Sequence, residues 1–157
     1  GVFNKYTTTL DTSSNHVVLC NPDDMGNLGT ICRTMLAYDF NNLAIIKPAA
    51  DIFNPKVIRA SMGAVFSLNV EQFSSFEEYQ HKFSNTTYTF MSDGNTLLDS
   101  VIFKKPCSLV FGNESQGLSQ EFKKIGTSVK IPQSTKVDSL NLSIAVGISL
   151  CKVNGTN

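Results

Sequence analysis

The chain has 157 residues, which suffices for one domain with one sizeable core, and 41% of them are hydrophobic while 17% are charged. This composition excludes a large multidomain enzyme and a disordered chain, and no apolar run approaches the ~18–20 residues of a membrane helix. The 13 basic and 13 acidic residues cancel, so bulk charge alone does not predict a nucleic-acid ligand. Residues 102–157 nevertheless hold seven lysines against three acidic residues, a net charge of +4, which allows an anionic partner without requiring one.

Cysteine and histidine usage indicates neither a disulfide framework nor a zinc site. There is no CxxC pair, and no histidine has the spacing of a metal ligand: the residues concerned are Cys20, Cys32, Cys107, Cys151, His16 and His81. The first residues do not form a basic and then apolar signal peptide. We therefore expect one cytoplasmic domain spanning residues 1–157, with no membrane segment and no metal.

Short apolar runs rich in β-branched residues predict buried strands, in chain order, at residues 16–20, 43–46, 64–68, 87–90, 108–111 and 128–131. Helical patterns lie between them at residues 26–38, 55–61, 76–83, with Ser74 or Ser75 as N-cap, and 140–152, with Ser139 as N-cap. Runs that are continuously apolar indicate strands covered on both faces. The alternation therefore predicts an α/β fold, a parallel sheet with helices on both faces, whose ligands bind at the carboxyl ends of the strands.

Three segments that follow predicted strands carry more polar and glycine residues than packing requires. The first, residues 21–34, is a strand-to-helix turn that contains Asn27 and Arg33. Its glycines could serve only to bring the helix close to the sheet, and Arg33 could be a solvated helix residue. The second, residues 109–119, is a loop bounded by Gly112 and Gly117 that carries Glu114. It is not a phosphate-binding P-loop, because Leu118-Ser119 stands where Lys-Ser/Thr is required.

The third segment, residues 131–147, leads from Ile131-Pro132 through a polar loop into a helix. Capping accounts for Ser139 but not for Asn141 and Ser143, since both residue types are mediocre helix formers in the first turns. Small residues at Ala145 and Gly147 would let another backbone approach the helix. This segment is therefore a candidate for more than packing.

In this order, the three segments resemble the sequence motifs of the SpoU/TrmH family of RNA ribose 2′-O-methyltransferases, in the SPOUT superfamily. The matching patterns are Asn-x-Gly-x-Ile-x-Arg at 27–33, Gly-x-Glu-x-x-Gly-Leu-Ser at 112–119, and Ile-Pro followed by Ser-Leu-Asn-x-Ser-x-Ala at 131–145. The resemblance covers roughly residues 15–151. It implies an α/β-knot fold with a deep C-terminal trefoil knot, S-adenosylmethionine bound by the C-terminal loops, an RNA substrate, either tRNA or rRNA, and a homodimer joined through the helix near Ser139.

The resemblance also implies roles for individual residues. Arg33 would be the catalytic arginine, Asn27 would shape the loop beside it, Ser139 and Asn141 would support that centre, and Glu114 would hold the active-site loops. The cofactor pocket would be lined by Gly112, Asn113, Ile131, Pro132, Leu140 and Asn141. The sequence departs from the usual pattern at Asp39, at Asn113, Ser115 and Gln116, and at Gln133, and none of these departures removes a matched polar residue.

The residue types suit this chemistry without a metal. A ribose hydroxyl is a poor acid, so its proton must be removed or its oxygen aligned with the methyl carbon. Free arginine, whose pKa lies above ~12, is an implausible base, so an electrostatic role for Arg33 on a phosphate is physically easier. The sequence does not identify the general base.

Three other interpretations compete. A knotted module that binds S-adenosylmethionine or RNA without catalysis is disfavoured by the retained motif residues. A nicotinamide-dependent oxidoreductase lacks its Gly-x-Gly-x-x-Gly run, since the glycines here are Gly26 and Gly29. A nucleophilic Cys32 beside Arg33 has no histidine near it in sequence, and packing is the better interpretation.

Overall fold

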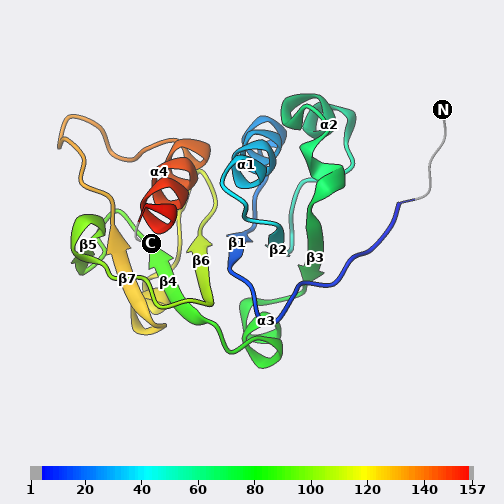
Figure 1. Cartoon of the computed structure of the whole chain (residues 1–157). Coiled ribbons are helices and arrows are strands. Elements are labelled where there is room, and N and C mark those ends of the chain that lie inside the picture. The colour runs from blue at the N-terminus through cyan, green and yellow to red at the C-terminus, as the bar shows by residue number, and fades with distance from the viewer. Residues whose placement is uncertain (1–4, 156–157) are drawn as a thin grey trace.

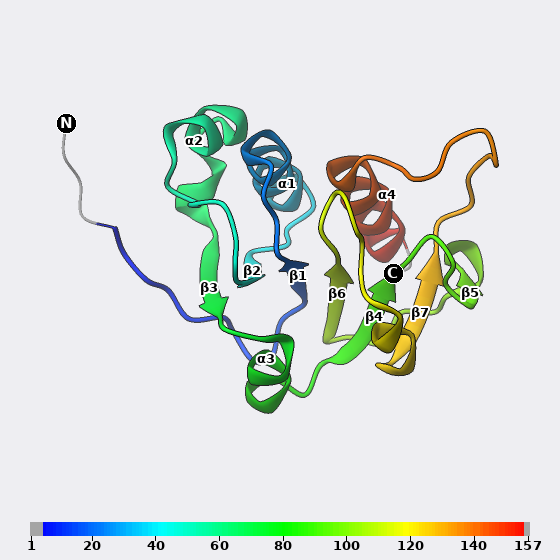
Figure 2. The same cartoon turned by 180° about the vertical axis from the view of Figure 1, so that it is seen from behind.

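The computed structural model describes residues 5–155, which form one seven-stranded parallel sheet with helices on both faces (Figures 1 and 2). The strands are β1 (His16–Cys20), β2 (Asn42–Ile46), β3 (Asn69–Phe73), β4 (Thr86–Phe90), β5 (Thr96–Leu97), β6 (Cys107–Phe111) and β7 (Thr127–Lys130). Their order in the sheet is β3-β2-β1-β6-β4-β7-β5. The predicted α/β class and parallel sheet are confirmed.

In the described residues, three α-helices and three short 3₁₀ helices lie between strands, and a fourth α-helix follows the last strand. They are α1 (Met25–Ala37), α2 (Pro55–Ser61), α3 (Phe76–Lys82), α4 (Leu142–Asn154), η1 (Ala64–Ser67), η2 (Leu98–Ser100) and η3 (Gln120–Lys124). In the described part of the chain, no helix is both long enough and apolar enough to cross a membrane.

Alternate residues of the central strands enter two separate cores. Val17, Leu19, Leu109 and their neighbours pack under α1, α2 and α4, whereas Val18, Val110 and their neighbours pack against α3 and η3. Because successive side chains in a strand point to opposite faces, β1 and β6 are buried on both faces. This is why these strands carry continuous apolar runs.

Two sequence predictions are corrected by the structure. Residues 64–68 do not form a strand: Met62 and Gly63 adopt left-handed backbone angles, with φ of 53° and 83°, and turn the chain into η1. The strand follows as β3, an edge strand that is only half buried and therefore has no continuous apolar run. The last helix begins at Leu142 with Asn141 as N-cap, rather than at residue 140 with Ser139. The predicted Ser75 cap of α3 is present.

A buried histidine joins the amino ends of β1 and β6 to α3. His16 Nδ1 lies 2.8 Å from the Tyr79 hydroxyl, which in turn hydrogen-bonds Ser108, and His16 Nε2 lies 2.8 Å from the carbonyl oxygen of Asp11. The carbonyl can only accept, so Nε2 carries the proton and Nδ1 accepts from Tyr79. Burial lowers the pKa of His16 below its ordinary value of 6.5, because the charged ring would be desolvated.

The stability of the fold should therefore fall in mild acid. A histidine whose folded-state pKa is depressed takes up its proton first in the unfolded chain, so stability is complete above pH ~6.5 and is lost as pH falls below it, with a slope of up to ~1.4 kcal/mol per pH unit. Urea unfolding at a series of pH values measures this slope. His16→Asn should flatten it, whereas replacing the exposed His81 by Asn should leave it unchanged; an identical slope in His16→Asn contradicts the assignment.

Candidate cofactor and catalytic site

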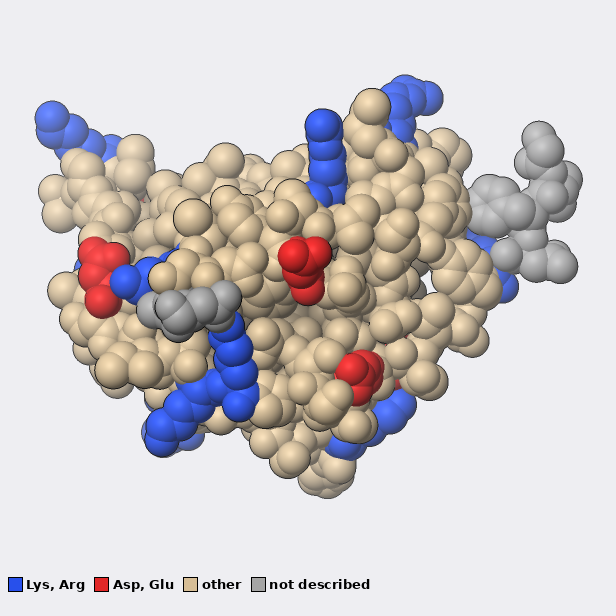
Figure 3. All heavy atoms as spheres, in the orientation of Figure 1, with Lys and Arg blue, Asp and Glu red and all other residues tan. Residues whose placement is uncertain are grey.

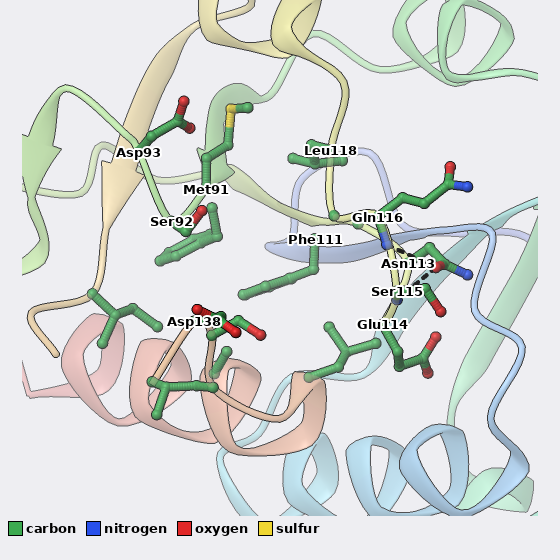
Figure 4. Close-up of a pocket in the computed structure, with 18 of the residues that line it drawn as sticks. Met91, Ser92, Asp93, Phe111, Asn113, Glu114, Ser115, Gln116, Leu118 and Asp138 are labelled. Carbon is green, nitrogen blue, oxygen red and sulfur yellow. Dashed lines mark hydrogen bonds between the residues drawn. The ribbon is translucent and has the colours of Figure 1, made fainter. Parts of the chain in front are cut away.

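The main candidate site is a cavity of about 460 Å³ at the carboxyl ends of the adjacent strands β6, β4 and β7. Three loops line it, at residues 91–93 after β4, 112–118 after β6 and 131–140 after β7, together with the start of α4 (Figure 4). Its lining residues are Phe90, Met91, Ser92, Asp93, Phe111, Gly112, Asn113, Glu114, Ser115, Gln116, Gly117, Leu118, Gln120, Val129, Ile131, Gln133, Asp138, Ser139, Leu140, Leu142 and Ala145. The site thus lies at the strand ends where ligands of parallel sheets bind.

The apolar side of this pocket comes from the last residues of the strands. Phe90 and Phe111 stack with their ring centroids 4.5 Å apart and their planes 12° apart. Val129 and Ile131 add aliphatic surface from β7 and the loop after it, and Leu142 adds it from α4. Such a wall suits the planar or apolar part of a ligand, while the loops supply polar groups.

The loop after β6 is tightly folded, and its two outer glycines make this possible. The Gly117 amide donates to the Asn113 carbonyl at 2.9 Å. A Cβ on Gly112 would lie 2.1 Å from the Gly117 carbonyl carbon, and Gly117 has a φ of 67°. No larger residue fits at Gly112 without opening the loop. Asn113 also ties this loop to the loop after β1, by donating to the Asn21 carbonyl at 3.0 Å.

Asp23 and Glu114 are neighbouring carboxyl residues, and the backbone amide of Asp23 donates to Glu114 Oε2 at 3.5 Å. The hydrogen bond from Glu114 lowers the pKa of Asp23, whereas burial, and then the bond to Asp23, raises the pKa of Glu114. The two directions agree if Glu114 holds the proton and donates it to an ionised Asp23. The second oxygen of Glu114 is then free to accept.

A chain of amide side chains continues from Glu114 to the start of α4. Asn27 Nδ2 donates to Glu114 Oε1 at 3.4 Å, and Asn141 Nδ2 donates to Asn27 Oδ1 at 3.0 Å. Asn141 Oδ1 in turn accepts from the backbone amide and the hydroxyl of Ser143, at 2.9 and 2.7 Å. One chain of hydrogen bonds therefore connects the three sequence motifs.

The charged side chains that line the pocket are all acidic. Its lining contains Asp93, Glu114 and Asp138 but no Lys, Arg or His. These three residues lie at separate points around the cavity (Figure 4). The cavity therefore favours a neutral or cationic ligand over a nucleotide phosphate.

The structure places the predicted site residues in two groups. Gly112, Asn113, Glu114, Ile131, Ser139 and Leu140 line the pocket, and Glu114, Asn27 and Asn141 form the amide chain beside it. Pro132 is exposed and does not line the pocket. Arg33 is exposed on α1 and makes no hydrogen bond or ion pair with the residues that the structure describes.

Sequence reasoning missed several residues of this site. Asp23 was not singled out, although an acidic residue directly after a strand is a recognisable signal. Phe90, Met91 and Ser92 had no motif to mark them, because the loop after β4 has no pattern of its own. Asp138 stands immediately before the matched Ser139 and could have been noticed.

Comparison with known proteins identifies the family. The model of the SpoU rRNA Methylase family matches residues 14–151. The chain belongs to this family. It is also 35% identical to a tRNA/rRNA methyltransferase of uncharacterised function from Synechocystis over 138 residues, which are 85% of this chain and 50% of that protein. The chain thus spans about half the length of this relative.

Two solved structures have the same fold as this chain. An AdoMet-bound rRNA methyltransferase from Sinorhizobium meliloti superposes with a TM-score of 0.84 at 31% identity, covering 92% of this chain and 57% of that one. A protein described for 2-OH methylation of C/U34 on tRNA gives a TM-score of 0.84 at 27% identity, covering 93% of this chain and 97% of that one. In addition, the described residues contain no cluster of His, Cys, Asp or Glu that could hold a metal ion.

The shared proton can be tested by titration. Asp23→Asn removes the charged acceptor of the Glu114 proton, so the pKa of Glu114 should fall toward its ordinary value, as followed by carbon-13 NMR of the glutamate carboxyl groups. The exposed Glu121→Gln serves as control and should leave the Glu114 titration unchanged. An unshifted Glu114 in Asp23→Asn would show that the two carboxyl groups do not share a proton.

Proposed function

We propose that this chain transfers a methyl group from S-adenosylmethionine to a ribose 2′-hydroxyl of tRNA or rRNA, as a SpoU methyltransferase domain. The observation that carries the proposal is the hydrogen-bonded chain that joins all three family motifs at one pocket. The AdoMet-bound relative and the protein described for tRNA methylation support it. Each is a separate protein, and the proposal transfers their activity class to this chain.

The pocket fits S-adenosylmethionine in size and charge. Its volume of about 460 Å³ lies within the usual range for small-molecule sites. The adenine ring can lie against the apolar wall of Phe111 and Ile131, and the loop backbone can bind its polar edge. The absence of cationic side chains from the lining suits a ligand that carries a sulfonium. When bound, this group supplies an electrophilic methyl carbon.

The protein must align the hydroxyl and release its proton. In the balanced reaction, the ribose oxygen bonds the methyl carbon, the bond from that carbon to sulfur breaks with its electrons going to sulfur, and the hydroxyl proton leaves to a base or to water. Asn27 and Asn141, held by Glu114 and Ser143, keep the start of α4 fixed against α1. Arg33 on α1 would bind a phosphate of the substrate and position the hydroxyl.

The surface of α1 and α2 suits RNA. Residues 25–38 and 52–70 include Arg33, Lys56 and Arg59 but no acidic residue. All three cations are exposed, and Lys and Arg side chains project at the edge where α1 and α2 lie (Figure 3). Phosphates of an RNA backbone would therefore meet positive charge beside the methyl-transfer site. The proposal places this activity in the cytoplasm.

The proposal includes the α/β-knot of the family and a homodimer. α4 packs on α1 and still exposes Ile144 and Ile148, with 53% and 39% of each residue accessible, on the same side as the exposed Cys151. An apolar stripe at helical spacing suits a second copy of the same helix. The pairing of two copies would then bring a second α1 or α4 to the edge of the site.

Methyl transfer is tested with labelled S-adenosylmethionine and unmodified tRNA and rRNA transcripts. We expect label in RNA that survives alkaline hydrolysis as a dinucleotide, because a methylated 2′-oxygen cannot attack the adjacent phosphate. Label on a base, or no label despite S-adenosylmethionine binding, would contradict the proposal; the second result would instead support a binding module.

Arg33→Ala should lower the single-turnover rate constant of methyl transfer by roughly a hundredfold or more, a typical loss when a charge-stabilising group is removed. The fold and S-adenosylmethionine affinity should be retained, because Arg33 is exposed and outside the pocket. Single-turnover methylation and calorimetry measure the two quantities. The exposed Lys124→Ala is the control, and full turnover in Arg33→Ala would remove Arg33 from the mechanism.

Ile148→Asp should dissociate the dimer, because it places a charge in the apolar stripe of α4. Sedimentation equilibrium measures the molecular mass in solution. The rate of methyl transfer should fall as the dimer dissociates. Ile102→Asp is the matched control, since Ile102 is 84% exposed and lies away from α4 in the sequence. A dimer that persists in Ile148→Asp would place the interface elsewhere.

A further inference from the structure

The three carboxylates that line the pocket differ in what neutralises them. Lys123 Nζ lies 2.6 Å from Asp93 Oδ2, and Gln120 donates to the same oxygen at 3.0 Å. Glu114 accepts from Asn27 Nδ2 at 3.4 Å and from the backbone amide of Asp23 at 3.5 Å. Both carboxyl groups are therefore already engaged by donors of the protein.

Asp138 is the remaining carboxylate. Its side chain has no hydrogen bond or ion pair with the residues that the structure describes, although its backbone carbonyl accepts from Gln133 at 3.3 Å. It lies in the loop after β7, three residues before Asn141, the N-cap of α4, and it lines the pocket. Among the described residues it is therefore an unpaired carboxylate on the pocket wall, beside the start of α4 (Figure 4).

We infer that Asp138 is a specificity-determining residue that binds the sulfonium of S-adenosylmethionine and so distinguishes this molecule from the product. This inference rests on the proposed function. S-adenosylmethionine carries one net positive charge at neutral pH, and S-adenosylhomocysteine carries none, although both have the same ammonium and carboxylate groups. Only the sulfonium differs, so only a carboxylate near the sulfur can discriminate the two by charge.

The placement of Asp138 has a consequence for turnover. Loss of the positive charge on sulfur during transfer removes the attraction to Asp138, so product affinity falls in the same step. No Lys, Arg or His side chain of the described residues lines the pocket, so none of them is present to bind the product by charge. Asp138 thus favours binding of S-adenosylmethionine and release of S-adenosylhomocysteine.

Calorimetric titration of both molecules tests the inference. Asp138→Asn keeps the size and polarity of the side chain but removes its charge. We expect it to weaken S-adenosylmethionine binding about tenfold, in line with a hydrogen bond or contact to a charged group. It should leave S-adenosylhomocysteine affinity unchanged. In the native protein, added salt should also bring the two dissociation constants closer together. In Asp138→Asn, added salt should leave their ratio unchanged.

Two further variants make the test specific. Asp138→Glu restores the charge and should recover most of the ratio, whereas Asp99→Asn removes an exposed carboxylate outside the pocket and should leave it unchanged. Thermal unfolding of each variant checks the fold, and an Asp138→Asn that unfolds is replaced by Asp138→Ser for the same titrations.

Three results would overturn the inference. Equal weakening of both molecules would place Asp138 on the shared ammonium, and unchanged binding with lost turnover would make it a proton acceptor. Unchanged binding and turnover would leave it without a role. If the native protein binds neither molecule, the proposed function fails instead, and this outcome is visible before any variant is made.

Discussion

The hydrogen bond between Asn27 and Asn141 is the contact on which the site depends. It joins α1 to the N-terminus of α4, although the two residues are 114 positions apart in the sequence. Glu114 holds the other end of the Asn27 amide, and Asn113 anchors the same loop to the turn after β1. The orientation of each amide is set by its neighbours, since a flipped amide would place two donors or two acceptors together.

The sheet makes this contact possible. β1 and β6 are neighbours in register, with Leu19 opposite Phe111, so the turns that follow them emerge side by side. β4 and β7 continue the sheet beyond β6, and their loops close the pocket. Because the loops after adjacent parallel strands emerge side by side, they form most of the pocket by themselves. Its polar groups come from short loops, and its apolar wall comes from Phe90 and Phe111.

Much of the fold could be predicted from the sequence because dry strands and capped helices leave local signals. The apolar run at β1 and the cap at Ser75 are examples. β3 could not be predicted, since an edge strand is half buried, and the preceding apolar residues are instead turned into η1 by the left-handed Met62 and Gly63. Asn141 replaces Ser139 as N-cap because its side chain also accepts from Ser143. The pocket residues Gly112 and Glu114 could be named from motifs, but the contact between Glu114 and Asp23 joins residues that are 91 positions apart.

The central claim is that the loops after β4, β6 and β7 form one binding site for S-adenosylmethionine, and hydrogen–deuterium exchange with and without this ligand tests it most directly. The account predicts that exchange slows together in residues 91–93, 112–118 and 131–140 when the ligand is added. It also predicts no change in residues 5–9, which line a second cavity beside β3. Slower exchange at that cavity alone, or no change anywhere, would contradict the account.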